Sequence, residues 1–287
     1  MPTFETPSPV SVDLDLVAAE IDITSSDRAD TVVTVRPGSE SEASARAAEQ
    51  TTVQYRGGKL AIRTPKPRRG LFTRSRPAED EKDSTIVVTI ELPSGSDLSG
   101  EAALGYLAAQ GRLGDCHFKS ACGNVRLEEA ASLRIEAALG DVYVGRVTGA
   151  AEITTTQGNL KVDVIGGAAR IKNLSGTTAL GDVTGDLRVT ATNGEVSVGR
   201  VFADVEAKNT NGDIYLGQVA GGEIVLETTR GSIGVGIPEG VAAHLDARSL
   251  LGGIYNALQD SAAPTEPGAT VRLRTRTVMG EIKIHRA

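Results

Sequence analysis

A glycine recurs between Gly105 and Gly231 at intervals of about 18 residues, and this spacing constrains the fold more than any other feature. The octets TNGEVSVG and TNGDIYLG, which begin at Thr192 and Thr210, show the repeat most clearly. The glycines that open equivalent segments are Gly105, Gly123, Gly140, Gly158, Gly176, Gly194, Gly212 and Gly231, with successive steps of 18, 17, 18, 18, 18, 18 and 19 residues. Repeats of this length predict a solenoid, in which each turn buries its apolar face against its neighbours.

Each repeat carries two short segments in which apolar and polar residues alternate. One segment follows the glycine, as with Val196 and Val198. The other lies in the second half of the repeat, as with Leu187 and Val189. A period of two is typical of β-strands, and the glycines then mark corners, since glycine adopts positive φ without a steric penalty. We therefore predict an all-β fold, a parallel β-solenoid (β-helix) of about 18 residues per turn.

The Asn-Gly pairs at the corners allow a second interpretation. Asn193-Gly194 and Asn211-Gly212 would suit the tight turn of an antiparallel hairpin. The constant spacing and the equivalent flanking strands favour stacked turns instead. Composition supports a stacked aliphatic core, because aromatic residues make up 3% of the chain and tryptophan is absent.

The chain divides at about residue 97. Residues 1–97 contain alternating segments without the 18-residue spacing, and we interpret them as a β-rich N-terminal cap section. Residues 98–287 form the solenoid, with regular repeats over 105–235 and irregular ones over 236–287, where GVGIPEG and APTEPG insert loops. A short helix is expected within SESEASARAAEQ, with Ser39 and Glu42 at capping-box spacing.

Net charge and hydrophobicity limit which partners and which cellular location can be expected. A net charge of −7 disfavours binding to duplex nucleic acid, whose affinity depends on neutralising phosphates. No apolar run approaches the roughly 20 residues of a membrane helix, so no transmembrane segment is expected. The start, MPTFETPSPVSVDLDL, lacks the basic and apolar regions of a secretory signal peptide. A cytoplasmic location is therefore expected.

Polar residues at the corners have two interpretations, one functional and one structural. They follow the repeat glycines and are Asn124, Asp141, Asn159, Glu195 and Asp213. Stacked oxygen ligands could form a calcium ladder, but the GGxGxD signature of calcium-binding β-rolls is missing. We favour turn capping, which is the ordinary role of such side chains.

Motifs for catalysis and metal binding are weak. Cys116, His117 and Cys122 lie close together, but zinc sites normally have two paired ligand clusters and this chain has one. Cys116 has the inward parity of Phe118, so a core position is expected. No nucleophile-elbow, metalloprotease or Walker A motif is present. We therefore expect no catalytic residues, no cofactor and no metal site.

Two surface features are candidates for interaction. The segment KPRRGLFTRSRP is basic, and its candidate residues are Arg68, Arg69, Leu71, Phe72, Arg74 and Arg76. AEDEKD follows at once, so a solvated connection is favoured over a basic arm that docks on an anionic partner or membrane surface. The second feature is an outward stripe with Tyr143, Tyr215 and Tyr255, since tyrosine is a good contact residue. Scattered surface tyrosines are the simpler interpretation.

The order of segments resembles that of a known bacterial family. RADTVVTVRP, AEQTTVQYRGGKLAIRTPK and ELPSGSDL precede the GDV-x-V-G repeats, and GIPEG and GEIKIHRA follow them. Over essentially the whole chain this order is similar to that of a family of unknown function labelled "putative adhesin", built of β-strand repeats and common in actinobacteria. The resemblance implies a β-solenoid without established catalytic residues.

These observations favour a non-enzymatic binding or scaffolding protein that uses the solenoid surface to contact a protein or polymer. A homo-oligomer through the terminal coil is a variant of this hypothesis, because GEIKIHRA ends without a visible cap and would leave a free strand edge. The alternative is a polysaccharide-acting enzyme on a β-helix, which requires acidic, basic and aromatic side chains to converge in one groove.

Overall fold

The computed structural model describes residues 2–65, 84–258 and 270–287. The chain forms two compact units, unit 1 (Met1–Val142) and unit 2 (Tyr143–Ala287). Parallel strands stack in both units with a step near 18 residues. Leu107 pairs with Val125 in unit 1, and Ala151 pairs with Ala169 in unit 2. The predicted all-β parallel solenoid is therefore confirmed.

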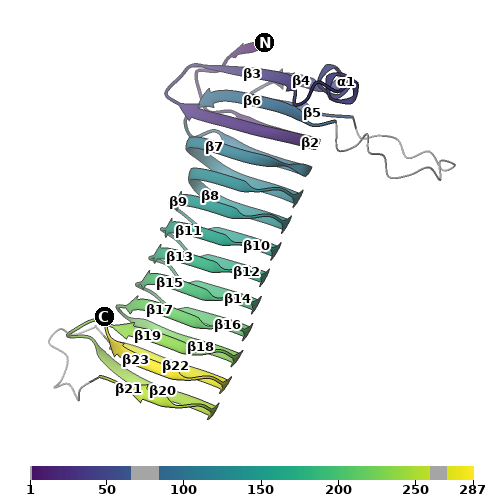
Figure 1. Cartoon of the computed structure of the whole chain (residues 1–287). Coiled ribbons are helices and arrows are strands. Elements are labelled where there is room, and N and C mark those ends of the chain that lie inside the picture. The colour runs from purple at the N-terminus through teal and green to yellow at the C-terminus, as the bar shows by residue number, and fades with distance from the viewer. Residues whose placement is uncertain (1, 66–83, 259–269) are drawn as a thin grey trace, which may run out of the picture. The chain divides into compact units, whose positions relative to one another are not determined.

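Unit 2 contains the most regular repeats, and each forms two parallel strands (Figure 1). The pairing of Leu160 with Thr178 and of Val196 with Ile214 repeats the 18-residue offset on the second strand of each turn. The strands of this part are β9 (Val142–Val147), β10 (Ala151–Gln157), β11 (Leu160–Ile165), β12 (Ala169–Ser175), β13 (Thr178–Val183), β14 (Leu187–Asn193), β15 (Val196–Val201), β16 (Val205–Asn211), β17 (Ile214–Val219), β18 (Gly222–Arg230) and β19 (Ile233–Ile237).

The interior of unit 2 is built from stacked aliphatic side chains. Val196 and Val198 on β15 are at most 2% exposed, and so are their partners Ile214 and Leu216 on β17. Each column of inward residues thus continues from turn to turn. The inward positions expected from the alternation are confirmed. The interior is narrow and must be filled at close-packed density at every turn. This explains why the chain is rich in valine, isoleucine and leucine and contains few aromatic residues.

The corner glycines of unit 2 form a column in which glycines of adjacent turns approach each other closely, as with Gly212 and Gly194 or Gly252 and Gly280. Their φ angles lie between +127° and +154°. A Cβ atom on Gly212 would lie 2.1 Å from the carbonyl oxygen of Gly194, so only glycine fits this position. In unit 1, Gly105 lies within the continuous strand β7 (Asp97–Cys122) and is not among the glycines with positive φ.

The last turns of unit 2 do not stack in the order of the sequence. β18 pairs with β22 (Thr270–Met279), and β22 pairs on its other side with β20 (Ala242–Leu251). In the same way β23 (Ile282–Arg286) lies between β19 and β21 (Ile254–Asn256), and all of these pairings are parallel. Figure 1 shows the yellow C-terminal strands between green ones. The expectation that GEIKIHRA forms the terminal coil is therefore wrong, because β20 and β21 occupy that place.

Unit 1 contains parallel turns that the glycine count does not reveal. Its long strand β2 (Ser11–Ser26) pairs in parallel with β7, which pairs in turn with β8 (Val125–Leu139). The short strands β5 (Lys59–Arg63) and β6 (Ile86–Pro93) also pair in parallel with the two halves of β2. Antiparallel strands then border them, with β4 (Thr52–Arg56) on β5 and β3 (Asp30–Pro37) on β6, while β1 (Thr3–Glu5) pairs with β3.

The expected helix is present as α1 (Glu42–Gln50). Its N-cap is Ser41, whose Oγ accepts a hydrogen bond from the backbone N–H of Ser44 at 3.0 Å. The capping role expected for Ser39 is therefore wrong, because the N-cap is Ser41, two residues further along the chain than the Ser39–Glu42 spacing suggests. Among the described residues, no helix is long and apolar enough to cross a bilayer.

Candidate functional site

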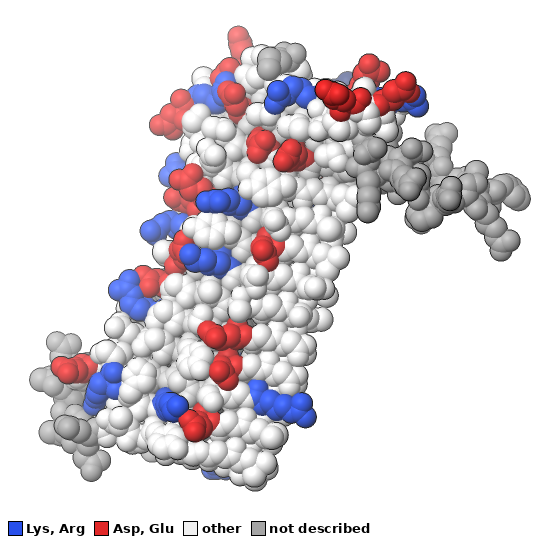
Figure 2. Space-filling model, in the orientation of Figure 1, with Lys and Arg blue, Asp and Glu red and all other residues white. Residues whose placement is uncertain are grey.

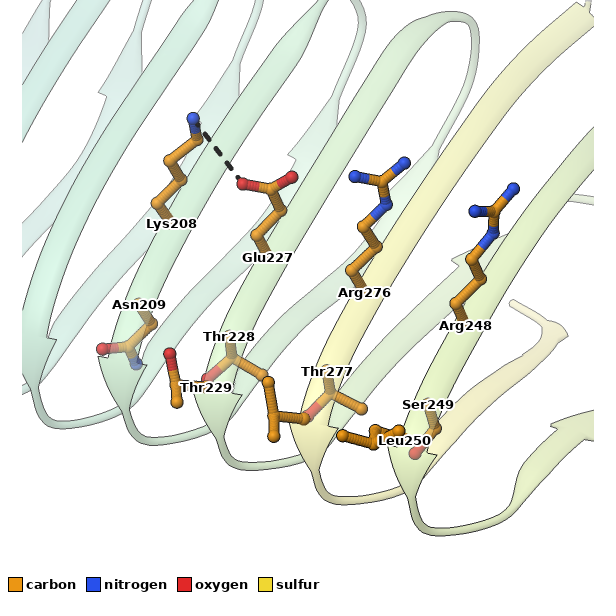
Figure 3. Close-up of a pocket in the computed structure, with 11 residues that line it drawn as sticks. Lys208, Asn209, Glu227, Thr228, Thr229, Arg248, Ser249, Leu250, Arg276 and Thr277 are labelled. Carbon is orange, nitrogen blue, oxygen red and sulfur yellow. Dashed lines mark ion pairs between the residues drawn. The ribbon is translucent and has the colours of Figure 1, made fainter.

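A surface groove crosses four adjacent strands of unit 2, β16, β18, β22 and β20, and has a volume of about 550 Å³ (Figure 3). One wall is a row of charged side chains in register on the four strands: Lys208, Glu227, Arg276 and Arg248. The opposite wall consists of Thr229, Val278 and Leu250 at the corner where the strands end. The groove therefore runs across the strands and not along any one of them.

The floor of the groove is formed by polar residues that turn inward at the corner: Asn209, Thr228, Thr277 and Ser249. Each donates a hydrogen bond to the carbonyl of a corner glycine in the adjacent turn. Asn209 Nδ2 donates to Gly194 O at 2.7 Å, and Thr277 Oγ1 donates to Gly231 O at 2.9 Å. Because successive strand residues point to opposite faces, the neighbours of each floor residue point outward and flank the groove.

Charge is distributed unevenly along the charged wall. Lys208 Nζ lies 3.1 Å from a carboxylate oxygen of Glu206 and 3.6 Å from one of Glu227. Its hydrogen bond with Glu206, followed by the attraction of both carboxylates, raises the pKa of Lys208 above its ordinary value. This end of the groove is therefore neutralised by ion pairs. Figure 2 shows the same mixture of signs over the face of the molecule in view.

The other end of the groove is basic. Arg272, Arg274 and Arg276 occupy successive outward positions of β22. Arg274 lies 3.8 Å from Asp246, which also accepts a hydrogen bond from Arg248 at 3.0 Å. No carboxylate of the described residues lies within 4.0 Å of the Arg276 guanidinium. Asp246 is therefore shared by Arg248 and Arg274. Together with Arg276, these residues give this end of the groove a net positive charge.

The corner wall becomes apolar toward the same end. Leu250 is 75% exposed, and Val278 beside it is also exposed. The equivalent corner positions of the two preceding turns in the sequence carry Thr192 and Thr210, although Leu174 stands at this position one turn earlier. The basic end of the groove thus combines guanidinium groups on one side with an exposed apolar surface on the other.

The structure places the three candidate tyrosines away from this groove. Lys161, Ser197 and Tyr215 belong to one column of paired residues on the second strand of each turn, and this column continues to Lys283 and Tyr255. The Tyr215 hydroxyl donates to Asp213 Oδ2 at 3.0 Å, which raises the pKa of Tyr215.

Tyr143 and Tyr255 each lie beside a lysine. The Tyr143 hydroxyl donates to Asp163 Oδ2 at 2.7 Å, and Lys161 Nζ lies 5.4 Å from the centre of its ring. Lys283 Nζ lies 5.9 Å from the Tyr255 ring. Tyr215 and Tyr255 are separated in the column by Gly234 and Lys283, so they do not form a continuous aromatic surface. The basic candidates Arg68, Arg69, Leu71, Phe72, Arg74 and Arg76 lie outside the described residues.

The corner side chains act as caps between turns. Asn124 Oδ1 accepts from the backbone N–H of Asp141 at 2.8 Å, and Asp213 Oδ1 accepts from that of Ser232 at 2.7 Å. Asn159 accepts from Thr177 in the same way, at 3.1 Å. These bonds confirm the turn-capping interpretation for the three residues.

The two thiols differ in environment. Cys116 is 2% exposed and packs in the core, as expected from its parity with Phe118, and burial raises the pKa of its thiol to about 12. Cys122 is exposed. A neutral, buried thiol is a poor metal ligand and a poor nucleophile.

The groove was missed by sequence reasoning, although one signal for it exists. VRLRTRTV, which contains Arg272, Arg274 and Arg276, alternates with a period of two and therefore places three arginines on one face of a strand. Arg248 lies in a different segment and reaches Arg276 only through the pairing of β20 with β22.

Comparisons with known proteins identify a matching family and several solved structures of low sequence identity. The family model for Toastrack DUF4097 matches residues 11–260. A crystal structure described as a putative cell adhesion protein from Clostridium sporogenes is 11% identical, with 100% of this chain and 98% of that chain covered and a TM-score of 0.23. A putative adhesin from Bacteroides fragilis is 13% identical, with 99% and 95% covered and a TM-score of 0.33.

A structure described as a putative lipid binding protein from Parabacteroides distasonis is 14% identical, with 100% and 95% covered and a TM-score of 0.30. Among curated proteins, none matches this sequence. The family match covers most of the chain and confirms the resemblance to a β-strand-repeat family of unknown function. The chain belongs to the Toastrack DUF4097 family.

Proposed function

We propose that this chain is a non-enzymatic binding protein that holds an extended anionic polymer in the groove across β16, β18, β22 and β20. The observation that carries the proposal is the adjacent pair Arg276 and Arg248, which faces the groove with few carboxylates to neutralise it. Paired strands lie roughly 4.8 Å apart, so Arg276 stands beside Arg248. Asp246 forms an ion pair with Arg248, which leaves the charge of Arg276 for an anion in the groove.

Arginine suits this role because its planar fork binds carboxylate or phosphate through two parallel hydrogen bonds. A ligand that carries negative groups at short intervals could bind Arg276 and Arg248 together. The apolar wall formed by Leu250 and Val278 would then cover the uncharged part of the same ligand and exclude water from the ion pairs. Lys208 and Glu227, at the other end, could donate to and accept from polar groups further along it.

Extension of the ligand follows from the direction of the groove. Its residues come from four strands in register, one from each turn at each row. A ligand that fills it therefore runs across the turns, which is how the faces of solenoid proteins bind elongated partners. A single small anion would occupy the two arginines and leave the Lys208 end empty.

A polysaccharide-acting enzyme is the second candidate, and one observation weighs against it. Glycoside hydrolysis uses two carboxyl groups on either side of the bond that is broken. Among the residues that line the groove, Glu227 is the one acid, and it is engaged by Lys208 at 3.6 Å. The groove therefore offers charge for binding but not an acid–base pair.

Fluorescence anisotropy with two labelled polyanions, poly-L-glutamate and polygalacturonate, tests the proposal. We expect at least one polymer to bind, and we expect Arg276→Gln to weaken binding about tenfold, in line with the loss of one well-placed charge contact. Arg276→Lys keeps the charge without the fork and should recover part of the affinity. Lys172→Gln is the matched control, since Lys172 is an exposed cation of β12, outside the groove.

Two outcomes would contradict the proposal. Equal affinities for Arg276→Gln and Lys172→Gln would show that the binding is a property of the surface charge in general. If neither polymer binds at low ionic strength, where salt screens charges least, the hypothesis of an anionic ligand is excluded. The enzyme hypothesis is tested by the length of each polymer after incubation, because shortening that Glu227→Gln abolishes would show that the groove cleaves the polymer.

A further inference from the structure

Among the described residues, the stack of unit 2 ends at a strand edge without a second partner. β20 pairs with β22 on one side, and none of the described strands pairs with its other side. The same holds for β21, which pairs with β23 alone within this part of the chain. An unpaired edge presents backbone N–H and C=O groups that another strand can use. In unit 1, by contrast, antiparallel strands border the parallel strands β5 and β6.

The apolar interior is also open at this edge. Ile224 on β18 and its partner Leu273 on β22 are at most 2% exposed, whereas Leu245, which pairs with Leu273 from β20, is half-buried. The second strand shows a larger difference: Ile282 on β23 is fully buried, and its partner Ile254 on β21 is 46% exposed. The terminal coil thus has inward side chains that need another layer to cover them.

The sequence of β20 is complementary to itself when two copies run antiparallel. With Ala247 opposite Ala247, Asp246 of each copy faces Arg248 of the other, and Leu245 faces Ser249. This register sets inward residues against inward ones and outward residues against outward ones. Moving the centre to Asp246 or to Arg248 would place two like charges directly opposite each other, which is destabilising. A shift by one residue in the pairing would set inward side chains against outward ones.

We propose that the terminal coil is the interface of a homodimer, in which β20 of one copy pairs antiparallel with β20 of a second copy about a two-fold axis at Ala247. A two-fold axis makes every contact occur twice, so both Asp246–Arg248 pairs form together. The second copy covers Leu245 and Ile254 and takes up the free backbone groups of β20. Leu251, which is 62% exposed, lies opposite Ala243 of the other copy and is covered at the rim.

Charge reversal provides the test, with molar mass measured by light scattering over a concentration series of the full chain. We expect the mass of the native protein to rise from that of a monomer to that of a dimer. Asp246→Arg and Arg248→Asp each create two repulsive pairs and should weaken the dimer at least about tenfold. The double variant restores both pairs in reversed polarity and should return to within about threefold of the native dissociation constant.

The controls separate this interface from other effects. Lys172→Asp changes the charge on β12 by the same amount and should leave the dimer unchanged, because β12 is paired on both sides. Hydrogen exchange of the native protein needs no variant: the amides of 242–251 should exchange more slowly as the concentration rises, while those of β12 stay constant.

Three results would overturn the proposal. They are a monomer at every concentration, a dimer that the single reversals leave intact, and a double variant as weak as the singles. Arg248 belongs to both this interface and the anion groove, so Asp246→Arg, at a residue that does not line the groove, separates the dimer from the anion site, which is tested at Arg276.

Discussion

The close approach of Gly212 to Gly194 shows what each corner requires of a single residue. The φ of Gly212 is +143°, and the Gly194 carbonyl occupies the place where a Cβ atom would be. The floor residue Asn209 donates its amide hydrogen to that same carbonyl at 2.7 Å. The corner thus combines a glycine with a side chain that donates a hydrogen bond to the glycine carbonyl of the adjacent turn. At the later turns, threonine or serine donates this bond in place of asparagine.

Gly212→Ala should lower the free energy of unfolding by about 2–4 kcal/mol, because it adds both backbone strain and a clash with a carbonyl oxygen. Gly240→Ala is the matched control: Gly240 also has a positive φ, +78°, but nothing lies within 4 Å of its Cβ position. We expect that control to cost about 1 kcal/mol. Denaturant unfolding measures both, and equal losses would show that the carbonyl contact contributes nothing.

At the scale of the element, neighbouring strands are joined by ion pairs on their outer faces as well as by backbone hydrogen bonds. Glu206 on β16 lies within ion-pair distance of Lys208 on its own strand and of Arg188 on β14. The hydrogen bond with Lys208, and then that with Arg188, lowers the pKa of Glu206 below its ordinary value. A group with a lowered folded pKa stabilises the fold above the unfolded pKa and loses that contribution as the pH falls through the folded value.

Glu206→Gln should therefore reduce stability at pH 7 by less than about 1 kcal/mol, the range for exposed pairs. The difference from the native protein should shrink as the pH falls below about 4, the ordinary glutamate pKa. Thermal unfolding from neutral to acidic pH measures it, with Glu239→Gln as a control at an exposed position without an ion pair among the described residues. A difference that persists at the acidic limit would rule out the ion pairs as its cause.

At the scale of the whole molecule, the order of strands in unit 2 departs from the order of the chain. β22 and β23 come last in the sequence but lie between two other turns. Their inward residues Val271, Leu273 and Ile282 are at most 2% exposed. The C-terminal segment therefore completes the core, while the stack ends with β20 and β21, which precede it in the chain.

Hydrogen exchange at low protein concentration should reveal this order. Amides of 270–279 have paired strands on both sides and should exchange slowly despite lying near the C-terminus, whereas amides of 242–251 should exchange faster. Peptide-resolved mass spectrometry distinguishes the two segments. Faster exchange in 270–279 than in 242–251 would contradict the inserted position of β22.

Much of the solenoid could be predicted because its information is local and repeated. The glycines from Gly123 to Gly231 mark corners through a conformation that other residues rarely adopt, and the alternation around Val196 and Ile214 reports which side chains face inward. The first parallel turn, β2, was hidden because no glycine repeat marks it. The place of Ser41 as N-cap was also missed, since Ser39 and Ser41 are chemically equal in sequence.

The sequence by itself determined the turn length, the inward residues and the parallel stacking, because each depends on residues within one repeat and its neighbours. Only the tertiary structure decided that β22 inserts between β18 and β20, since pairing between equivalent strands does not require the order of the chain. That insertion brings Arg276 beside Glu227 and Arg248, and it leaves β20 with one paired strand among those that the structure describes. The groove and the terminal coil therefore arise from strand order, a property of the stack that no single repeat encodes.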